Sequence, residues 1–320
     1  MIERGYMMIE QTTEARALAG DYTAEGTLSV TAPFDFAQTL RFVAAFTPMT
    51  GEQQIGDGTL RKAVMIEQTS VVFTVDAAGD VEQPRLRYTL ASAAPLTKAI
   101  ERAAVDRIRF FLSLDDDLRP FYAAAQASDP AFLPVIQRLY GFHQVKFLAP
   151  FENACWAVLT QRTPMAVARA LKQRLVARYG AALMVDGAAY AAFPEAETLA
   201  AAERDELAAL LRNERKASYL HAIATAFAAV DEDWLRTGPY EQVRDWLLAI
   251  DGVGPWSANF VLIRGLGRMD TVATPEKELL AAARNVYGAD ITPDALLHLA
   301  RAVYSDHAGY WSFYLRNATR

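Results

Sequence analysis

The chain has 320 residues, of which 52% are hydrophobic and 22% are charged, and its formal net charge at pH 7 is −6. This length is enough for two or three hydrophobic cores, and the composition is that of a soluble protein. No apolar run reaches the roughly 18 to 20 residues of a membrane span, and residues 1–20 lack the apolar core of a signal peptide. We therefore expect a cytoplasmic, monomeric protein that does not bind membranes.

The acidic net charge argues against a broad electrostatic contact with nucleic acid, because phosphate groups are bound mainly by Lys and Arg. Any nucleic-acid surface must therefore be local. Taken singly, each basic residue is more often a solvated surface charge. The candidates are Arg162, Arg169, Lys172 and Arg174 in one predicted helix, Arg212, Arg215 and Lys216 in a second segment, and Arg264 and Arg268 in a third.

Cysteine and histidine usage excludes several kinds of site. Cys155 is the only cysteine, so neither an intrachain disulfide nor a four-cysteine metal cluster can form. It lies in the apolar segment NACWAVLT, which is typical of a core cysteine rather than a nucleophile. The histidines show no spacing typical of transition-metal ligands; they are His143, His221, His298 and His307.

Residues 21–113 carry the signals of β-strands. The segments YTAEGTLSV, TLRKAVMIEQTSVVFTVDA and PRLRYTLA alternate apolar and polar residues or run through β-branched residues. Two amphipathic helical segments, PFDFAQTLRFVAAF and LTKAIERAAVDRIRFFLSL, accompany them. The pattern predicts an α+β domain over residues 1–115, in which helices cover a curved antiparallel sheet.

From about Leu118 to the end, alanine-rich amphipathic segments dominate. They are separated by turn signals such as SDP, TGP, DGVGP and YGAD. No internal repeat and no low-complexity tract interrupts them. This half of the chain, residues 116–320, is therefore predicted to be a helical domain.

Within the helical half, residues 243–265 predict two helices joined by a tight glycine turn. Gly252 and Gly254 flank Val253, and glycine permits positive φ and close approach of another backbone. Pro255 suits the first position of the second helix. Outward-pointing amides of Val253 and Gly254, together with the helix dipole, would bind a phosphate group. Taken alone, a Gly-Val-Gly turn is more often a helix C-cap followed by a new helix.

The flanking residues narrow this choice. The segment LLAIDGVGPWSANFVLIRG resembles the hairpin of the helix-hairpin-helix base-excision DNA glycosylases. The order of PFDFAQTLRFVAAF, the β-rich stretch, QRTPMAVARAL and the hairpin is similar to 3-methyladenine DNA glycosylase II, the AlkA type. The resemblance implies a TATA-binding-protein-like N-terminal domain and two helical subdomains that meet at a cleft. It also implies a double-stranded DNA partner with damaged, alkylated bases, and a nucleoid-associated protein if the source is bacterial.

The resemblance places the catalytic carboxylate on Glu276, where the family has an aspartate. Such a carboxylate stabilises the oxocarbenium-like transition state or orients water. Glutamate is one methylene longer, roughly 1.5 Å, which puts the rate in question. Asp270 and Glu278 remain alternatives, and a shift of the loop by one residue would place Lys277 at the site instead. Glu276 and Glu278 could also be acidic residues of a helix's first turn.

The same comparison supplies a pocket for the base. Trp256 stands where family members that also nick the strand carry a lysine, and an indole cannot form an imine, so a monofunctional enzyme is implied. Trp256, Phe260 and Phe42 fall on aromatic pocket positions, where π faces attract a cationic alkylated base. His307 replaces the family's pocket tryptophan. Plain core packing is the alternative for each aromatic.

Two further roles come from the resemblance. Arg162, which follows Gln161, falls on the position of the residue that fills the gap left by a flipped base. An exposed arginine without a partner and a glutamine bound to a helix end are the alternatives. Main-chain carbonyls of Ile250, Gly252 or Val253 could hold a monovalent cation, and no other cofactor is expected.

Three functions remain open from the sequence. The first is a DNA repair N-glycosylase that excises damaged bases in base excision repair. The second is a DNA-damage-binding protein of the same fold that has lost catalysis. The third is a helical interaction module without a nucleic-acid role, which only the acidic net charge favours.

Overall fold

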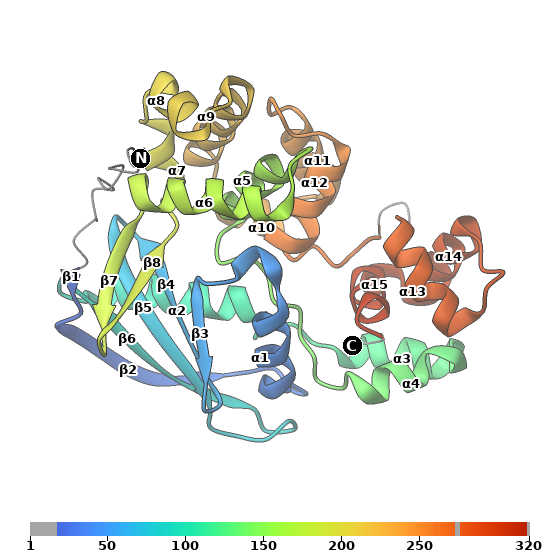
Figure 1. Ribbon diagram of the computed structural model, residues 1–320. Coiled ribbons are helices and arrows are strands. Elements are labelled where there is room, and N and C mark those ends of the chain that lie inside the picture. The colour runs from blue at the N-terminus through green and yellow to red at the C-terminus, as the bar shows by residue number, and fades with distance from the viewer. Residues whose placement is uncertain (1–17, 273–275, 319–320) are drawn as a thin grey trace, which may run out of the picture.

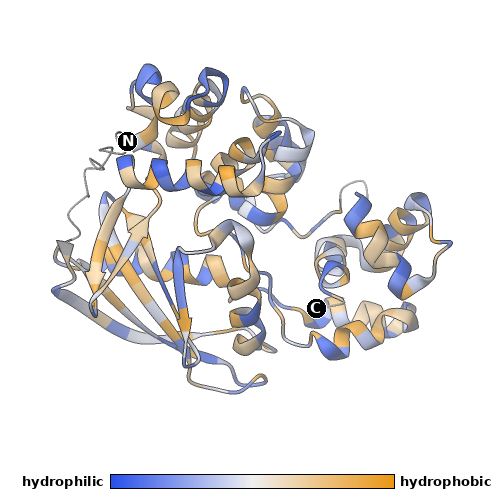
Figure 2. Cartoon of the chain, in the orientation of Figure 1, coloured by the Kyte–Doolittle hydropathy of each residue, from blue (hydrophilic) through white to orange (hydrophobic). Residues whose placement is uncertain are grey.

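The computed structural model describes residues 18–272 and 276–318 (Figure 1). Its N-terminal part holds an antiparallel sheet with the strand order β2-β6-β5-β4-β3. Burial alternates along β2 and β6, and Figure 2 shows both hydrophobic and hydrophilic positions along the strands of the sheet. The predicted α+β part is thus confirmed. The strands are β2 (Tyr22–Ser29), β3 (Gln53–Gly56), β4 (Thr59–Ile66), β5 (Thr69–Ala77) and β6 (Arg85–Ser92).

Two helices, α1 (Phe36–Ala45) and α2 (Lys98–Leu112), accompany this sheet, and the short turn η1 (Thr47–Met49) follows α1. Asp35 caps α1 and Thr97 caps α2, each by accepting a hydrogen bond from the main-chain N–H three residues on. α2 lies across one face of the sheet. Phe111 of α2 meets Phe73 of β5 there, with 6.4 Å between the ring centroids.

A β-hairpin from the second half of the chain covers the other face of the sheet. It consists of β7 (Ala181–Val185) and β8 (Ala188–Ala192), and β7 also pairs in parallel with β1 (Leu18–Ala19). Leu183 and Tyr190 form a second small core with Val72 of the sheet. The sequence patterns miss this hairpin, because its alanine-rich strands have the composition of the helices around it.

The remaining helices form two lobes, which stand apart in Figure 1. The first lobe surrounds α5, whose residues from Pro150 to Leu159 are all buried. It comprises α5 (Pro150–Thr160), α6 (Met165–Tyr179), α7 (Ala196–Ala200), α8 (Arg204–Leu211), α9 (Glu214–Ala229), α10 (Glu232–Thr237), α11 (Tyr240–Leu248), α12 (Pro255–Phe260) and the π-helical turn η3 (Val261–Gly265). In the described part of the chain, no helix is long and apolar enough to cross a membrane.

The second lobe combines helices from before and after the first. It comprises α3 (Arg119–Ser128), η2 (Pro130–Phe132), α4 (Leu133–Arg138), α13 (Lys277–Tyr287), α14 (Pro293–Leu299), η4 (Ala300–Tyr304), η5 (Ser305–His307) and α15 (Ala308–Arg316). Its core is aromatic: the Asp129 carboxylate accepts hydrogen bonds from the Tyr287 and Tyr304 hydroxyls, each at 2.7 Å. Burial raises the pKa of both phenols, which keeps them as donors.

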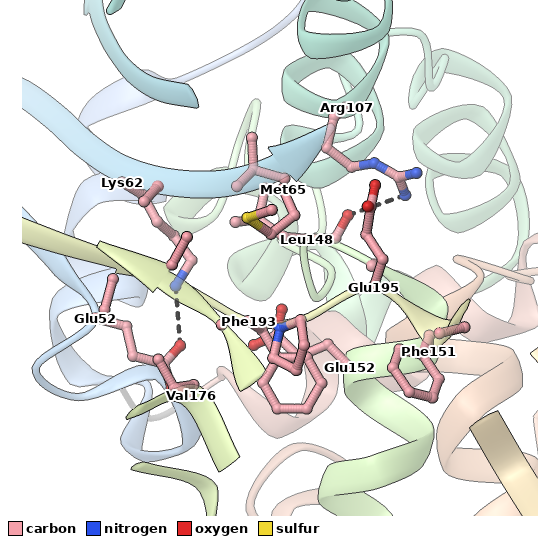
Figure 3. Close-up of a pocket in the computed structure, with 18 of the residues that line it drawn as sticks. Glu52, Lys62, Met65, Arg107, Leu148, Phe151, Glu152, Val176, Phe193 and Glu195 are labelled. Carbon is pink, nitrogen blue, oxygen red and sulfur yellow. Dashed lines mark hydrogen bonds and ion pairs between the residues drawn. The ribbon is translucent and has the colours of Figure 1, made fainter. Parts of the chain in front are cut away.

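The sheet and the first lobe enclose a pocket of about 550 Å³ (Figure 3). Glu52, Lys62 and Glu152 are among the residues that line it. Lys62 Nζ pairs with Glu52 at 2.9 Å, and Lys172 Nζ, behind the lining, pairs with Glu52 at 2.5 Å and with Glu152 at 2.6 Å. We call these four residues the buried ion network. None of the predicted site residues lines this pocket.

Candidate functional site

The predicted pair of helices joined by a glycine turn is present: α11 and α12 are joined by the turn that contains Gly252 and Gly254. Gly252 has φ +90°, and a Cβ there would lie 2.3 Å from the Tyr219 ring, so both conformation and space require glycine. Gly254 has φ −89° and faces open space, just before the first turn of α12. Its N–H makes no main-chain hydrogen bond to another described residue.

One expectation about this turn is wrong. The Val253 N–H does not point outward, because it donates to the Ile250 carbonyl at 3.0 Å, and the Val253 side chain is buried. The predicted anion site is therefore limited to the Gly254 N–H and the free N–H groups that begin α12. The open space beside Gly254 lets a phosphate approach these groups.

We expect Gly254→Asp to weaken DNA binding about tenfold at any base sequence, since its carboxylate repels phosphate. Asp is a favourable N-cap residue and meets no neighbour at this position, so α12 should still form. The matched control is Gly254→Asn, which caps without charge and should bind DNA nearly as wild type. Fluorescence anisotropy at low salt measures both affinities. Equal affinity of the folded Asp variant and wild type would rule out the anion site.

The loop between α5 and α6 lies against this turn. Gln161 Nε2 donates to the Gly252 carbonyl at 2.8 Å, so Gln161 joins the loop to the hairpin rather than only ending its own helix. Arg162 follows with φ +51° and an exposed side chain. The structure thus brings together Gln161, Arg162 and Gly252, and it places Arg162 in the loop between α5 and α6.

The carbonyls proposed for a monovalent cation are partly engaged. The Ile250 oxygen accepts the Val253 N–H, and the Gly252 oxygen accepts the Gln161 amide. Each carbonyl oxygen has a second lone pair, which remains available to a cation. Among the described residues, no cluster of His, Cys, Asp and Glu could hold a metal ion.

The predicted aromatic residues form most of one row. Trp256 is 59% exposed and stacks on Phe260, with 5.2 Å between centroids and 8° between ring planes. Phe147 and Phe46 continue this row from Phe260 to Phe42. We call these five residues the aromatic row.

The two ends of the aromatic row differ. Trp256 offers an open π face, whereas Phe42 is 8% exposed and packs against Phe142 and Phe313. The Arg264 guanidinium lies 5.1 Å from the centroid of the Phe42 ring. Phe42 is therefore a core residue in this state of the protein, as the packing alternative proposed, and Trp256 is the accessible aromatic surface.

His307 lies outside the aromatic row. It precedes α15 and is partly exposed, and no ring contact connects it with another aromatic residue of the described chain. Two residues further on, the Gly309 N–H of α15 donates to the Met269 carbonyl, in the segment after the hairpin, at 2.9 Å.

Glu276 occupies the N-cap position of α13, but its side chain makes no capping hydrogen bond. It pairs instead with Arg316 at the end of α15, and both side chains are partly exposed. The first-turn explanation therefore fits Glu278, which is exposed, better than Glu276. Residues 273–275, which set the alignment of this loop with the family, lie outside the described residues.

Asp270 has a structural role. It pairs with Arg268 at 3.2 Å, and Arg268 in turn donates to the Gly238 carbonyl at 2.8 Å. These contacts tie the segment after the hairpin to the loop between α10 and α11. This geometry fits a structural residue better than it fits the catalytic alternative given for Asp270.

Comparison with known proteins assigns these features to a family. Residues 155–303 match the family model described as HhH-GPD superfamily base excision DNA repair protein. This span contains the Arg162 loop, the hairpin and Glu276. Residues 155–303, nearly half of the chain, thus belong to the HhH-GPD superfamily.

Proteins with similar sequences carry the names of DNA repair enzymes. The chain is 31% identical over 179 residues to the DNA-3-methyladenine glycosylase of Bacillus subtilis, which covers 55% of this chain and 59% of that protein. It is 30% identical over 276 residues to a Mycobacterium tuberculosis protein named probable bifunctional transcriptional activator/DNA repair enzyme AlkA. This alignment covers 85% of this chain and 52% of that protein. The chain spans about half the length of the curated relatives it matches.

Solved structures share the fold of this HhH-GPD protein. The 3-methyladenine DNA glycosylase of Archaeoglobus fulgidus aligns with a TM-score of 0.72 and 20% identity, over 91% of this chain and 97% of that chain. The 8-oxoguanine glycosylase/lyase of Clostridium acetobutylicum aligns with a TM-score of 0.64 and 12% identity, over 95% and 100%. At these identities the likeness concerns the fold alone.

Several basic residues of this HhH-GPD protein contact other parts of the protein instead of being only solvated surface charges. Lys172 belongs to the buried ion network, Arg264 lies over aromatic rings, and Arg268 holds a main-chain carbonyl. Lys216 binds main-chain carbonyls at the end of α5. The other candidates are also exposed or partly exposed: Arg162, Arg169, Arg174, Arg212 and Arg215. Sequence cannot reveal such long-range partners, because they come from distant segments.

Cys155 is fully buried in α5, as its apolar context predicts. Burial raises the pKa of its thiol, so the reactive thiolate form is disfavoured. A nucleophilic role for this cysteine is therefore excluded by its environment, and the carboxylate at Glu276 remains the candidate for chemistry.

Proposed function

We propose that this protein is a monofunctional DNA N-glycosylase, which acts as a monomer and hydrolytically removes flipped-out alkylated bases from double-stranded DNA. The observation that carries the proposal is the partly exposed carboxylate of Glu276. It follows a helix-hairpin-helix turn in a chain of the HhH-GPD superfamily. The names of the sequence relatives, DNA-3-methyladenine glycosylase and AlkA, support the choice of substrate.

The carboxylate supplies the charge that the reaction needs. As the bond between the base and C1′ of the sugar breaks, positive charge develops on the sugar, and a nearby carboxylate stabilises it or orients the attacking water. The bond electrons leave with the base, and water adds to C1′ while it gives a proton to the Glu276 carboxylate, which then releases that proton to solvent. Arg316 pairs with Glu276 and holds the carboxylate at the start of α13. Trp256 has no amine, so no imine forms and the strand stays uncut.

Positioning of DNA falls to the two neighbouring loops. The Gly254 N–H and the start of α12 hold a backbone phosphate without reading sequence. Arg162 enters the duplex where the base has left the stack, and its planar guanidinium can replace stacking. The open face of Trp256 attracts a cationic alkylated base.

The proposal is tested with duplexes that each contain one modified base. The purified protein is incubated with each duplex, and alkali then reveals abasic sites. We expect cleavage after alkali for alkylated bases and none before it. Salt-dependent DNA binding without base release from any lesion would instead mean a DNA-damage-binding protein. Absence of DNA binding would mean a helical interaction module.

Arg162 should matter most where a base must be unstacked. Arg162→Gly removes the side chain and keeps the left-handed backbone at this position. We expect the rate of excision from a paired duplex to fall roughly tenfold or more, because flipping costs a few kcal/mol. The loss on a single-stranded substrate should be smaller. A uniform loss on every substrate would mark Arg162 as an ordinary phosphate contact.

A further inference from the structure

The end of α5 lies beside the Arg162 loop, and its carbonyl oxygens meet the ammonium group of Lys216. Lys216 Nζ donates to the carbonyls of Val158 at 2.7 Å, Leu159 at 3.0 Å and Gln161 at 3.0 Å. An ammonium has three N–H donors, so all three are used on main-chain oxygens. A cation at this position also offsets the negative end of the α5 dipole.

Lys216 is held in place from its own helix. It lies in the first turn of α9, and its main-chain N–H donates to the Asn213 side chain at 2.9 Å. Burial lowers the pKa of Lys216, and no carboxylate of the described residues forms an ion pair with it. Its ammonium therefore serves the end of α5 rather than an acidic partner.

The first two turns of α9 contact both the Arg162 loop and the hairpin turn. Lys216 binds the Gln161 carbonyl, and the Gln161 side chain donates to the Gly252 carbonyl at 2.8 Å. Tyr219, three residues after Lys216, packs so closely on Gly252 that no Cβ fits between them. The Arg162 loop and the hairpin turn are thus both fixed to the same short piece of helix.

We propose that Lys216 is a positioning residue that sets the place of Arg162 relative to the hairpin. The inference rests on the proposed function, in which Arg162 enters the duplex while the hairpin holds a phosphate nearby. These two contacts must fit one stretch of DNA at the same time. A displacement of about 1 Å in such an arrangement costs roughly 100-fold in rate. Lys216 acts through the loop and touches neither the base nor the sugar.

The test compares Lys216→Met with wild type in three measurements. Fluorescence of 2-aminopurine at the target position reports flipping, single-turnover assays report base release, and affinity at several salt concentrations reports the number of phosphate contacts. We expect flipping and base release to fall roughly 10- to 100-fold with an unchanged salt slope. Lys216→Arg should restore part of both, because it returns a cation to the carbonyls.

Two further variants keep the test decisive. Lys98→Met removes an exposed lysine of the N-terminal part and should leave all three measurements unchanged. Gln161→Met removes the link to Gly252 from the other side and should reproduce the loss of flipping, even if Lys216→Met fails to fold. A salt slope that falls by about one would make Lys216 a phosphate contact and overturn the proposal. Wild-type flipping in folded Lys216→Met or in folded Gln161→Met would also overturn it.

Failure of the proposed function gives a different result. If wild type releases no base, the 2-aminopurine signal still compares flipping in wild type and variants, because it does not require catalysis. A loss of flipping in Lys216→Met would then support the positioning role in a protein that only binds DNA. Lower thermal stability with unchanged flipping would leave Lys216 with a structural role only, against the proposal.

Discussion

Replacing Glu276 by Gln should abolish base release, with a fall in the single-turnover rate on the order of 100-fold or more. The amide keeps the size of the side chain but carries no charge for the cationic sugar. Binding to a duplex with a stable abasic-site analogue should stay within about threefold, because this charge develops in the transition state rather than in the ground state. Single-turnover assays and anisotropy measure the two effects separately.

The matched control is Glu278→Gln, which removes an exposed carboxylate two residues away in the same helical turn. It should excise as wild type does. If Glu276→Gln excises alkylated bases at the wild-type rate, Glu276 is not catalytic. Asp270 would then be the next candidate, although its ion pair with Arg268 favours a structural role.

The extra methylene of Glu276 relative to the family's aspartate has a visible counterpart in the structure. The longer side chain reaches Arg316 on α15, and an aspartate would end roughly 1.5 Å sooner. Glu276→Asp should therefore weaken this ion pair and retract the carboxylate toward α13. We expect this variant to retain or exceed the wild-type rate, since it restores the length found in the family.

Local signals made much of this fold predictable. The hairpin was predictable because glycine and proline act on their own positions, and Gly252 does require positive φ. The large sheet was predictable from its alternating pattern. The β7–β8 hairpin was not, because its strands are short and rich in alanine, and they are stabilised by packing on a distant sheet.

The site was predictable to a lesser degree, because its partners are distant in sequence. Nothing near Val253 shows that its N–H is used inside the turn. The same holds for Lys216 and Lys172, which look like surface charges in sequence yet bind buried carbonyls and carboxylates. Burial of a charge depends on which segments meet, and a single sequence does not specify this.

Lys172→Met should cause the largest loss of stability of any substitution considered, roughly 3 to 5 kcal/mol in the free energy of unfolding. Burial acts to lower the pKa of Lys172, but the carboxylates of Glu152 and Glu52 outweigh it and raise the pKa. The variant would leave the Glu152 carboxylate buried without this cation, and Glu152 is only 3% exposed. Urea denaturation at neutral pH measures the loss, with Lys98→Met as the exposed-lysine control.

A double variant separates the charge effect from lost packing. Adding Glu152→Gln to Lys172→Met removes the uncompensated charge, so we expect part of the stability to return. Glu52 still pairs with Lys62, and although burial acts to raise its pKa, the two lysines of the wild type hold that pKa at about 2. Were Lys172→Met to cost no more than Lys98→Met, the network would contribute nothing to stability. Lys172 lies on α6, the helix that directly follows the Arg162 loop. A large loss of stability in Lys172→Met would therefore mean that the buried ion network also anchors this helix.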